Sequence, residues 1–175
     1  MQAQGREPEE RRPLILVVVY SWDLIQLVTA LFVAFAAFAG SQVVHGRIRP
    51  VPVPEQLLAG LSAAAWAATF FIVGTLLTRR QLWVRRAQVV ILAVSMALGL
   101  ISLGVASIPA DTRPTPSQVY AQLLIVLLNA GALAAMQGER VRGWFREPGR
   151  IPRYLYGTVG LWVAGQALLV VLNLG

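Results

Sequence analysis

The sequence contains no cysteine, no lysine and a single histidine, His45. The absence of cysteine excludes disulfides, thiolate metal sites, iron–sulfur clusters, thiol catalysis and lipidation on cysteine. One histidine cannot build a bis-histidine haem or a multi-histidine metal centre within this chain. We therefore expect no cofactor and no metal. His45 is expected in a solvated loop, and its alternative role is to ligate a pigment or metal shared with a partner.

Charge is also scarce, because only 13% of the 175 residues are charged, whereas 57% are hydrophobic. Soluble domains average about 25% charged and about 45–50% apolar residues. A water-soluble globule is therefore excluded, and so are intrinsic disorder and a collagen-like fibre, which need far less apolar content. The remaining class is an integral membrane protein of one domain.

Five apolar runs are long enough to cross a bilayer core about 30 Å thick, which requires about 20 helical residues. A backbone at this depth must satisfy its own hydrogen bonds, so each run is predicted to be a helix. The sequence thus predicts an all-α, polytopic membrane helix bundle with five transmembrane helices, over residues 14–39, 57–77, 84–106, 118–136 and 154–174.

The arginines predict the orientation of these helices. Three arginines precede the first run, and five lie between the fourth and fifth. Four lie between the end of the second run and the first turn of the third, which begins with Arg85 and Arg86. The other connections hold two and one, and the C-terminus holds none. Because basic residues accumulate in cytoplasmic loops, we expect a cytoplasmic N-terminus and an external C-terminus. The expected location is the plasma (inner) membrane, as a multi-pass protein.

The predicted helices and their orientation divide the chain into four parts: a flexible cytoplasmic N-terminus over 1–13, a four-helix transmembrane unit over 14–136, a basic amphipathic interface segment over 137–153, and a fifth transmembrane helix over 154–175. The first run is longer than the 7–15 residues of a signal-peptide core, so an uncleaved signal-anchor is expected. The prolines from Pro50 to Pro54 and from Pro109 to Pro116 predict stiff, extended outer connections.

Asp23 is the one acid inside an apolar run. A carboxylate at a helix centre costs about 2.5–3.5 kcal/mol, which the surrounding aliphatic and phenyl side chains offset. Two interpretations stay open. Asp23 could form a proton or cation site with Gln26 and an amide from the fourth helix. Alternatively, Asp23 could be the ion-pair or hydrogen-bond partner of Arg85 or Arg86 at the inner end of the third helix.

The fourth helix carries Gln122 and Asn129, seven residues apart and hence on one face. Such amides usually hydrogen-bond a neighbouring helix, and they could instead line a polar path. Together with Asp23 and Gln26, they make up the candidate intramembrane polar site. Small residues also recur at intervals of four on several helices, which favours close helix association without specifying the partner: Gly60, Ala64 and Ala68; Ser95 and Gly99; Gly131 and Ala135; Gly160 and Ala164.

The segment over 137–153 interleaves apolar and basic residues. Helical spacing places Val141, Trp144 and Phe145 on one face and arginines on the other, beside lipid phosphates. Since the arginines lie close to the membrane edges, anionic inner-leaflet lipids are the expected partners, and no nucleic acid is expected. The residues assigned to lipid contacts or ion pairs at the inner face are Arg79, Arg80, Arg85, Arg86, Arg140, Arg142 and Arg146.

Three short patterns, Arg12-Pro13, Arg85-Arg86 and the stretch from Val141 to Phe145, lie before the first helix, at the third and after the fourth. In this outline the chain resembles uncharacterised prokaryotic four-helix integral membrane proteins over residues 12–145. The resemblance implies a four-helix unit and no known activity. This chain differs by its fifth helix, which suggests an added contact surface.

The sequence contains no nucleophile elbow, phosphate loop, zinc-binding helix or paired carboxylates at reactive spacing. An enzyme is therefore not expected. The first hypothesis is a small accessory or scaffolding subunit of a larger membrane complex, bound to a membrane protein partner. The alternative is a small homo-oligomeric transporter or channel that uses Asp23 and the amides of the fourth helix.

Overall fold

The computed structural model describes residues 12–44, 47–50, 52–106 and 115–174. Five of its helices are long and apolar enough to cross a membrane. In chain order the elements are α1 (Leu14–Phe38), β1 (Ser41–Val44), β2 (Arg47–Pro50), α2 (Val53–Leu76), α3 (Leu82–Ala106), α4 (Pro116–Gln137), α5 (Glu139–Trp144) and α6 (Arg153–Leu174). The five predicted transmembrane helices correspond to α1, α2, α3, α4 and α6.

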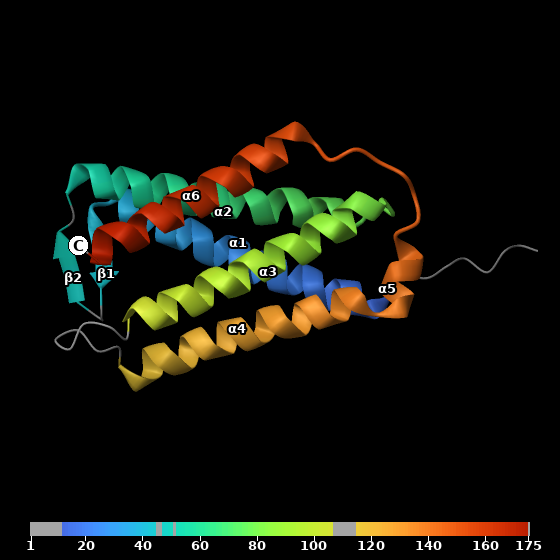
Figure 1. The fold of residues 1–175 in the computed structure, drawn as a ribbon, viewed down its shortest axis with the longest axis horizontal. Helices are drawn as coiled ribbons and strands as arrows, with labels where there is room; N and C mark the ends of the chain where they lie inside the picture. The colour runs from blue at the N-terminus through green and yellow to red at the C-terminus, as the bar shows by residue number, and fades with distance from the viewer. Residues whose placement is uncertain (1–11, 45–46, 51, 107–114, 175) are drawn as a thin grey trace, which may run out of the picture.

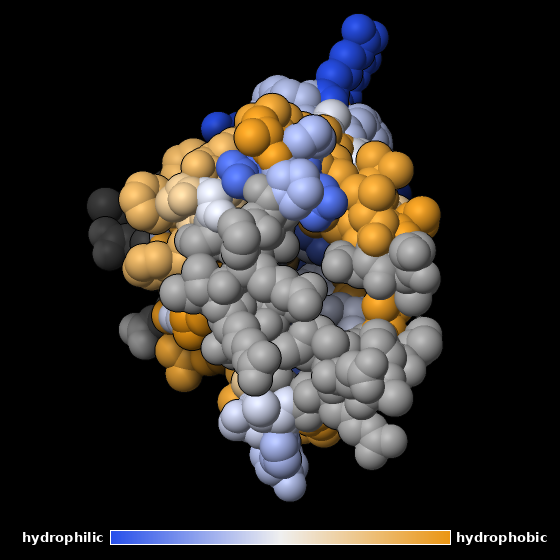
Figure 2. All heavy atoms as spheres, turned by 90° about the vertical axis from the view of Figure 1, so that its left-hand side faces the viewer, coloured by the Kyte–Doolittle hydropathy of each residue, from blue (hydrophilic) through white to orange (hydrophobic). Residues whose placement is uncertain are grey.

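The helices pack as two connected groups. The most extensive contacts join α1 to α2, α2 to α6, and α3 to α4, and smaller contacts of α1 with α4 and of α3 with α6 join the groups. Figure 1 shows α5 at one end of the bundle and the strand pair at the other. The end that carries α5 is called the arginine-rich end below. Apolar side chains cover the flanks of the bundle seen from the strand end (Figure 2), as expected for surfaces that face lipid.

A two-stranded antiparallel hairpin was not predicted from the sequence. Its strands pair Ser41 with Pro50 and Val44 with Arg47. Gly40 ends α1 with a positive φ of 76°, a conformation that favours glycine just after a helix. The expected extended proline segment is also shorter than predicted, because α2 already begins at Val53. Pro54 fits in that first turn, where no intrahelical partner for its nitrogen is needed.

Two main-chain hydrogen bonds join separate connections at the arginine-rich end. Leu82 N donates to Glu147 O, and Glu147 N donates to Arg80 O, each at 2.9 Å. The turn between α2 and α3 is thereby bound to the segment that leads from α5 into α6. We call this pair of bonds the main-chain clamp.

The core of the bundle lies near the arginine-rich half and is built from aromatic and aliphatic side chains. Trp66 and Trp162 stack with ring centroids 6.2 Å apart, and Phe70 meets the Trp162 ring edge-on. Val141 and Phe145, from the basic interface segment, belong to the same buried cluster. The apolar face of that segment therefore packs on the bundle, while Arg140, Arg142 and Arg146 are exposed.

Candidate functional site

Asp23 lies on the inward face of α1 and is 2% exposed. Its Oδ1 atom accepts a hydrogen bond of 2.7 Å from Nε2 of Gln88 on α3, which is fully buried. Among the described residues, Asp23 Oδ2 and Gln88 Oε1 have no hydrogen-bond partner. The acid is thus held by one neutral amide inside the bundle.

A second polar cluster is centred on Asn129 of α4, which is fully buried. Its Oδ1 atom accepts hydrogen bonds from Trp22 Nε1 at 3.0 Å and from Gln26 Nε2 at 3.2 Å. Its Nδ2 atom donates to Ser95 Oγ on α3 at 3.4 Å. A single asparagine therefore joins α1, α3 and α4. Interhelical amide contacts of this kind are worth about 0.6–2 kcal/mol each.

The four predicted polar residues are only partly brought together. Gln26 and Asn129 are in direct contact, as the cluster above describes. Gln122 lies further along α4 and donates from Nε2 to the carbonyl oxygen of Gly99 at 3.2 Å. Gln122 and Gln26 line one cavity, whereas Asp23 faces Gln88 and lines a separate, smaller one with residues of α1 and α2.

Several polar residues of the bundle were missed by sequence reasoning. Gln88 and Ser95 lie seven residues apart on α3, which is the same spacing that drew attention to Gln122 and Asn129. A search of every predicted helix for polar residues seven positions apart would have identified Gln88 and Ser95. On α6, Gln166 Nε2 donates to Ser62 Oγ at 3.2 Å, and Ser62 Oγ donates to the carbonyl oxygen of Trp162 at 3.1 Å.

Arg85 has a different partner from the one expected in the ion-pair interpretation of Asp23. Its Nε atom donates to the carbonyl oxygen of Met136 at 3.0 Å, and its Nη2 atom donates to Gln137 Oε1 at 3.3 Å. Both acceptors lie in the last turn of α4. A helix ends with carbonyls that have no intrahelical partner and a partial negative charge, so a guanidinium is stabilising there.

The other arginines assigned to the inner face gather at the arginine-rich end. Arg80 lies over the ring of Trp144 at 4.1 Å, and Arg142 donates to Gln137 Oε1 at 3.3 Å. Arg79 and Arg86 are exposed. The remaining pair, Arg140 and Arg146, lines a surface pocket that is described next.

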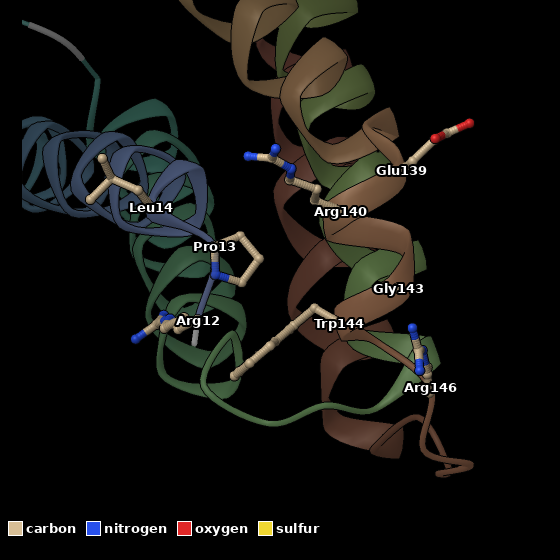
Figure 3. Close-up of a pocket in the computed structure, with 8 residues that line it drawn as sticks. All are labelled: Arg12, Pro13, Leu14, Glu139, Arg140, Gly143, Trp144 and Arg146. Atoms are coloured by element: carbon tan, nitrogen blue, oxygen red, sulfur yellow. The ribbon is translucent and has the colours of Figure 1, made fainter. Parts of the chain in front are cut away.

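This pocket of about 570 Å³ lies between the start of α1 and α5, and Arg12 also lines it. In Figure 3, Arg140 and Trp144 extend from α5 toward the start of α1, and Glu139 extends to the opposite side. Pro13 and Leu14 form the wall next to the apolar part of α1. Arg12 and Arg140 provide two guanidinium groups beside this apolar wall, which suits a phosphate group, whereas Arg146 lies on the other side of α5 in Figure 3.

Within the described residues, no group of three or more acidic or histidine side chains could hold a metal ion. His45 lies outside the described residues, so its alternative role as a shared ligand stays a prediction. No family model, curated protein or solved structure matches this chain.

Proposed function

We infer that this protein is an accessory or scaffolding subunit of a larger membrane complex. The single observation that carries the proposal is the poor coverage of two transmembrane helices. In α2, 56% of the apolar window is buried within the chain, whereas in α4 and α6 the share is 17%. A helix with apolar residues on all sides and few contacts within its own chain has surface available for another protein as well as for lipid.

The glycines of these helices support the same proposal. A Cβ atom added at Gly131 of α4, or at Gly157 or Gly160 of α6, would meet no other described atom within 4 Å. At Gly60 and Gly165 an added Cβ would lie within 2.6 Å of a packed side chain. Some small residues thus serve packing within the chain, while others are open to the close approach of a partner helix.

The proposal also retains the orientation and location predicted from the arginines. The arginine-rich end faces the cytoplasm and contacts anionic lipids of the inner leaflet of a prokaryotic plasma membrane. Gly157 and Gly160 lie in the first half of α6, so its partner contact lies in the part of the membrane nearest the cytoplasm.

The test is purification from native membranes in a mild detergent, followed by mass spectrometry of co-migrating chains. A stoichiometric foreign chain is expected, and its recovery should fall in Gly160→Ile and Gly131→Ile. Gly104→Ile is the matched control, because Gly104 is equally open but lies on α3. Recovery of this chain alone from its native membrane, as a monomer, would contradict the proposal.

A second candidate function is a homo-oligomeric transporter or channel. One observation favours it, namely that Gln26 and Gln122 line the same cavity inside the bundle. In that case the chain purifies as a homo-oligomer, and Gln122→Leu lowers ion or solute flux in proteoliposomes. Asp23→Asn tests whether the separate cavity beside Asp23 belongs to the same path. Unchanged flux and an unchanged protein level in Asp23→Asn would remove Asp23 from any transport role.

A further inference from the structure

A cavity of about 340 Å³ lies inside the bundle, and all five transmembrane helices contribute to its wall. Its volume falls within the range of small-molecule sites, which is about 300–1,000 Å³. Its wall includes three indoles, Trp22, Trp66 and Trp162, and three amides, Gln26, Gln122 and Gln166. Aromatic surface with a few placed polar groups is the usual composition of a ligand site.

The amides of the wall are held in fixed positions. Gln122 donates to Gly99 O, Gln166 to Ser62 Oγ and Gln26 to Asn129 Oδ1, each at 3.2 Å. A carboxamide has two N–H donors and an oxygen with two acceptor positions, and each of these bonds uses one donor. The described bonds therefore orient the amides and leave hydrogen-bonding capacity for a bound molecule.

Among the described residues, none of those that line the wall is formally charged, although the chain has a net charge of +7. A charged ligand would have to lose its hydration without a compensating partner, which is strongly unfavourable. An uncharged ligand loses much less. The occupant should therefore be neutral, with groups that accept or donate hydrogen bonds.

The edge of the cavity indicates where such a molecule enters. Ile25 of α1 and Leu124 and Leu128 of α4 line the cavity and are also exposed on the outside of the bundle, at 55%, 56% and 43%. The opening between α1 and α4 thus adjoins the surface that faces the hydrocarbon. A ligand that reaches it must be soluble in the membrane.

We propose that this cavity binds the ring of an uncharged, planar, membrane-soluble molecule of the quinone class. Trp22 and Trp66 are half-buried and provide aromatic surface for the ring, and the amide N–H groups match its carbonyl oxygens. The residues that line the cavity do not include Gly131, Gly157 or Gly160, the open glycines that support the accessory role. The inference therefore goes beyond the accessory role and holds whether or not that role is correct.

The test uses menadione, a naphthoquinone without a lipid tail, and the purified full chain in phosphatidylcholine nanodiscs. Quinones quench indole fluorescence on contact, and three of the five tryptophans of the chain line the cavity. Saturable quenching is expected above the linear collisional background. Gln122→Leu should raise the half-saturating concentration about tenfold, the value of one good hydrogen bond. Leu127→Ala is the matched control, because Leu127 is exposed on the same helix and does not line the cavity, and it should leave the half-saturating concentration unchanged.

Ser102→Leu provides an independent variant if Gln122→Leu does not fold. Ser102 lines the cavity but is exposed, so a larger side chain there narrows the site without removing a described hydrogen bond. It should abolish saturable quenching while circular dichroism and gel filtration stay unchanged. Quenching that is linear in every variant would overturn the proposal. Equal binding of a sulfonated, charged naphthoquinone would overturn it too. The proposal would also be overturned if a phospholipid chain occupied the cavity and menadione did not displace it.

Discussion

Gln88 on α3 donates a 2.7 Å hydrogen bond to the carboxyl group of Asp23 on α1. Both side chains are buried, and α1 and α3 belong to the two different groups of packed helices. The pair therefore lies where the two halves of the bundle meet. Its contribution to the fold can be separated from any role in transport by stability measurements.

Replacing one member of this pair should destabilise the protein more than replacing both. Asp23→Leu leaves the Gln88 amide unpaired and should cost about 1–3 kcal/mol of unfolding free energy. Asp23→Leu combined with Gln88→Leu should recover most of that loss, since neither group is then left without a partner. Denaturant unfolding in detergent micelles measures both. Strictly additive losses in the double variant would mean that the two side chains do not interact.

The glycines predict opposite effects for the same substitution on one helix. A Cβ added at Gly165 would lie 2.6 Å from Cβ of Ser62, so Gly165→Ala should cost about 1–3 kcal/mol. Gly160→Ala adds a methyl group in open space and should stabilise α6 by up to about 1 kcal/mol. Thermal unfolding of the isolated chain compares them. Similar midpoints for the two variants would contradict the packing of α6 on α2.

The arginine pocket predicts a site-specific lipid effect. Arg140→Gln and Arg12→Gln should each weaken the retention of phosphatidylglycerol by about fivefold. The reason is that each basic residue near an anionic lipid surface contributes about 1 kcal/mol of binding free energy. Arg142→Gln is the control, because Arg142 lies two residues from Arg140 and does not line the pocket. Native mass spectrometry after mixed-lipid reconstitution measures retention. Equal losses in all three variants would indicate a diffuse charge effect, and loss of lipid to added inorganic phosphate would indicate a free-anion site.

Arg85 predicts a local effect at the end of α4. Arg85→Met removes the hydrogen bond to the Met136 carbonyl and should cost about 1 kcal/mol, because the site is partly exposed. The last turn of α4 should then exchange its amide hydrogens faster, whereas α1 and α2 should not change. Hydrogen–deuterium exchange detects this, with Arg86→Met at the neighbouring exposed position as control. Protection that is equal in both variants would exclude a capping role.

Helix positions followed from the sequence because a membrane-spanning run depends on composition and length alone. The predicted runs over 14–39 and 154–174 differ from α1 and α6 by one residue at a single end. The hairpin was missed because Ser41–Val44 and Arg47–Pro50 are short and gain stability from each other, which no local pattern reports.

The partner of Asp23 could not be chosen from the sequence. Arg85, Arg86 and Gln88 lie within one turn of α3, and small differences in the rotation and depth of that helix decide which of them meets α1. Asn129 was predictable as an interhelical amide, but its three partners on two other helices depend on the packing of the whole bundle.

The main-chain clamp has a consequence for how the protein could evolve and be engineered. Its donors and acceptors are backbone atoms of Arg80, Leu82 and Glu147, so side-chain substitutions leave them in place and only proline removes a donor. The segment that leads into α6 therefore stays bound to the turn before α3 while the outer surface of α6 is free to change. Substitutions on the outer surface of α6 can therefore create a new binding specificity without altering the main-chain hydrogen bonds that precede this helix.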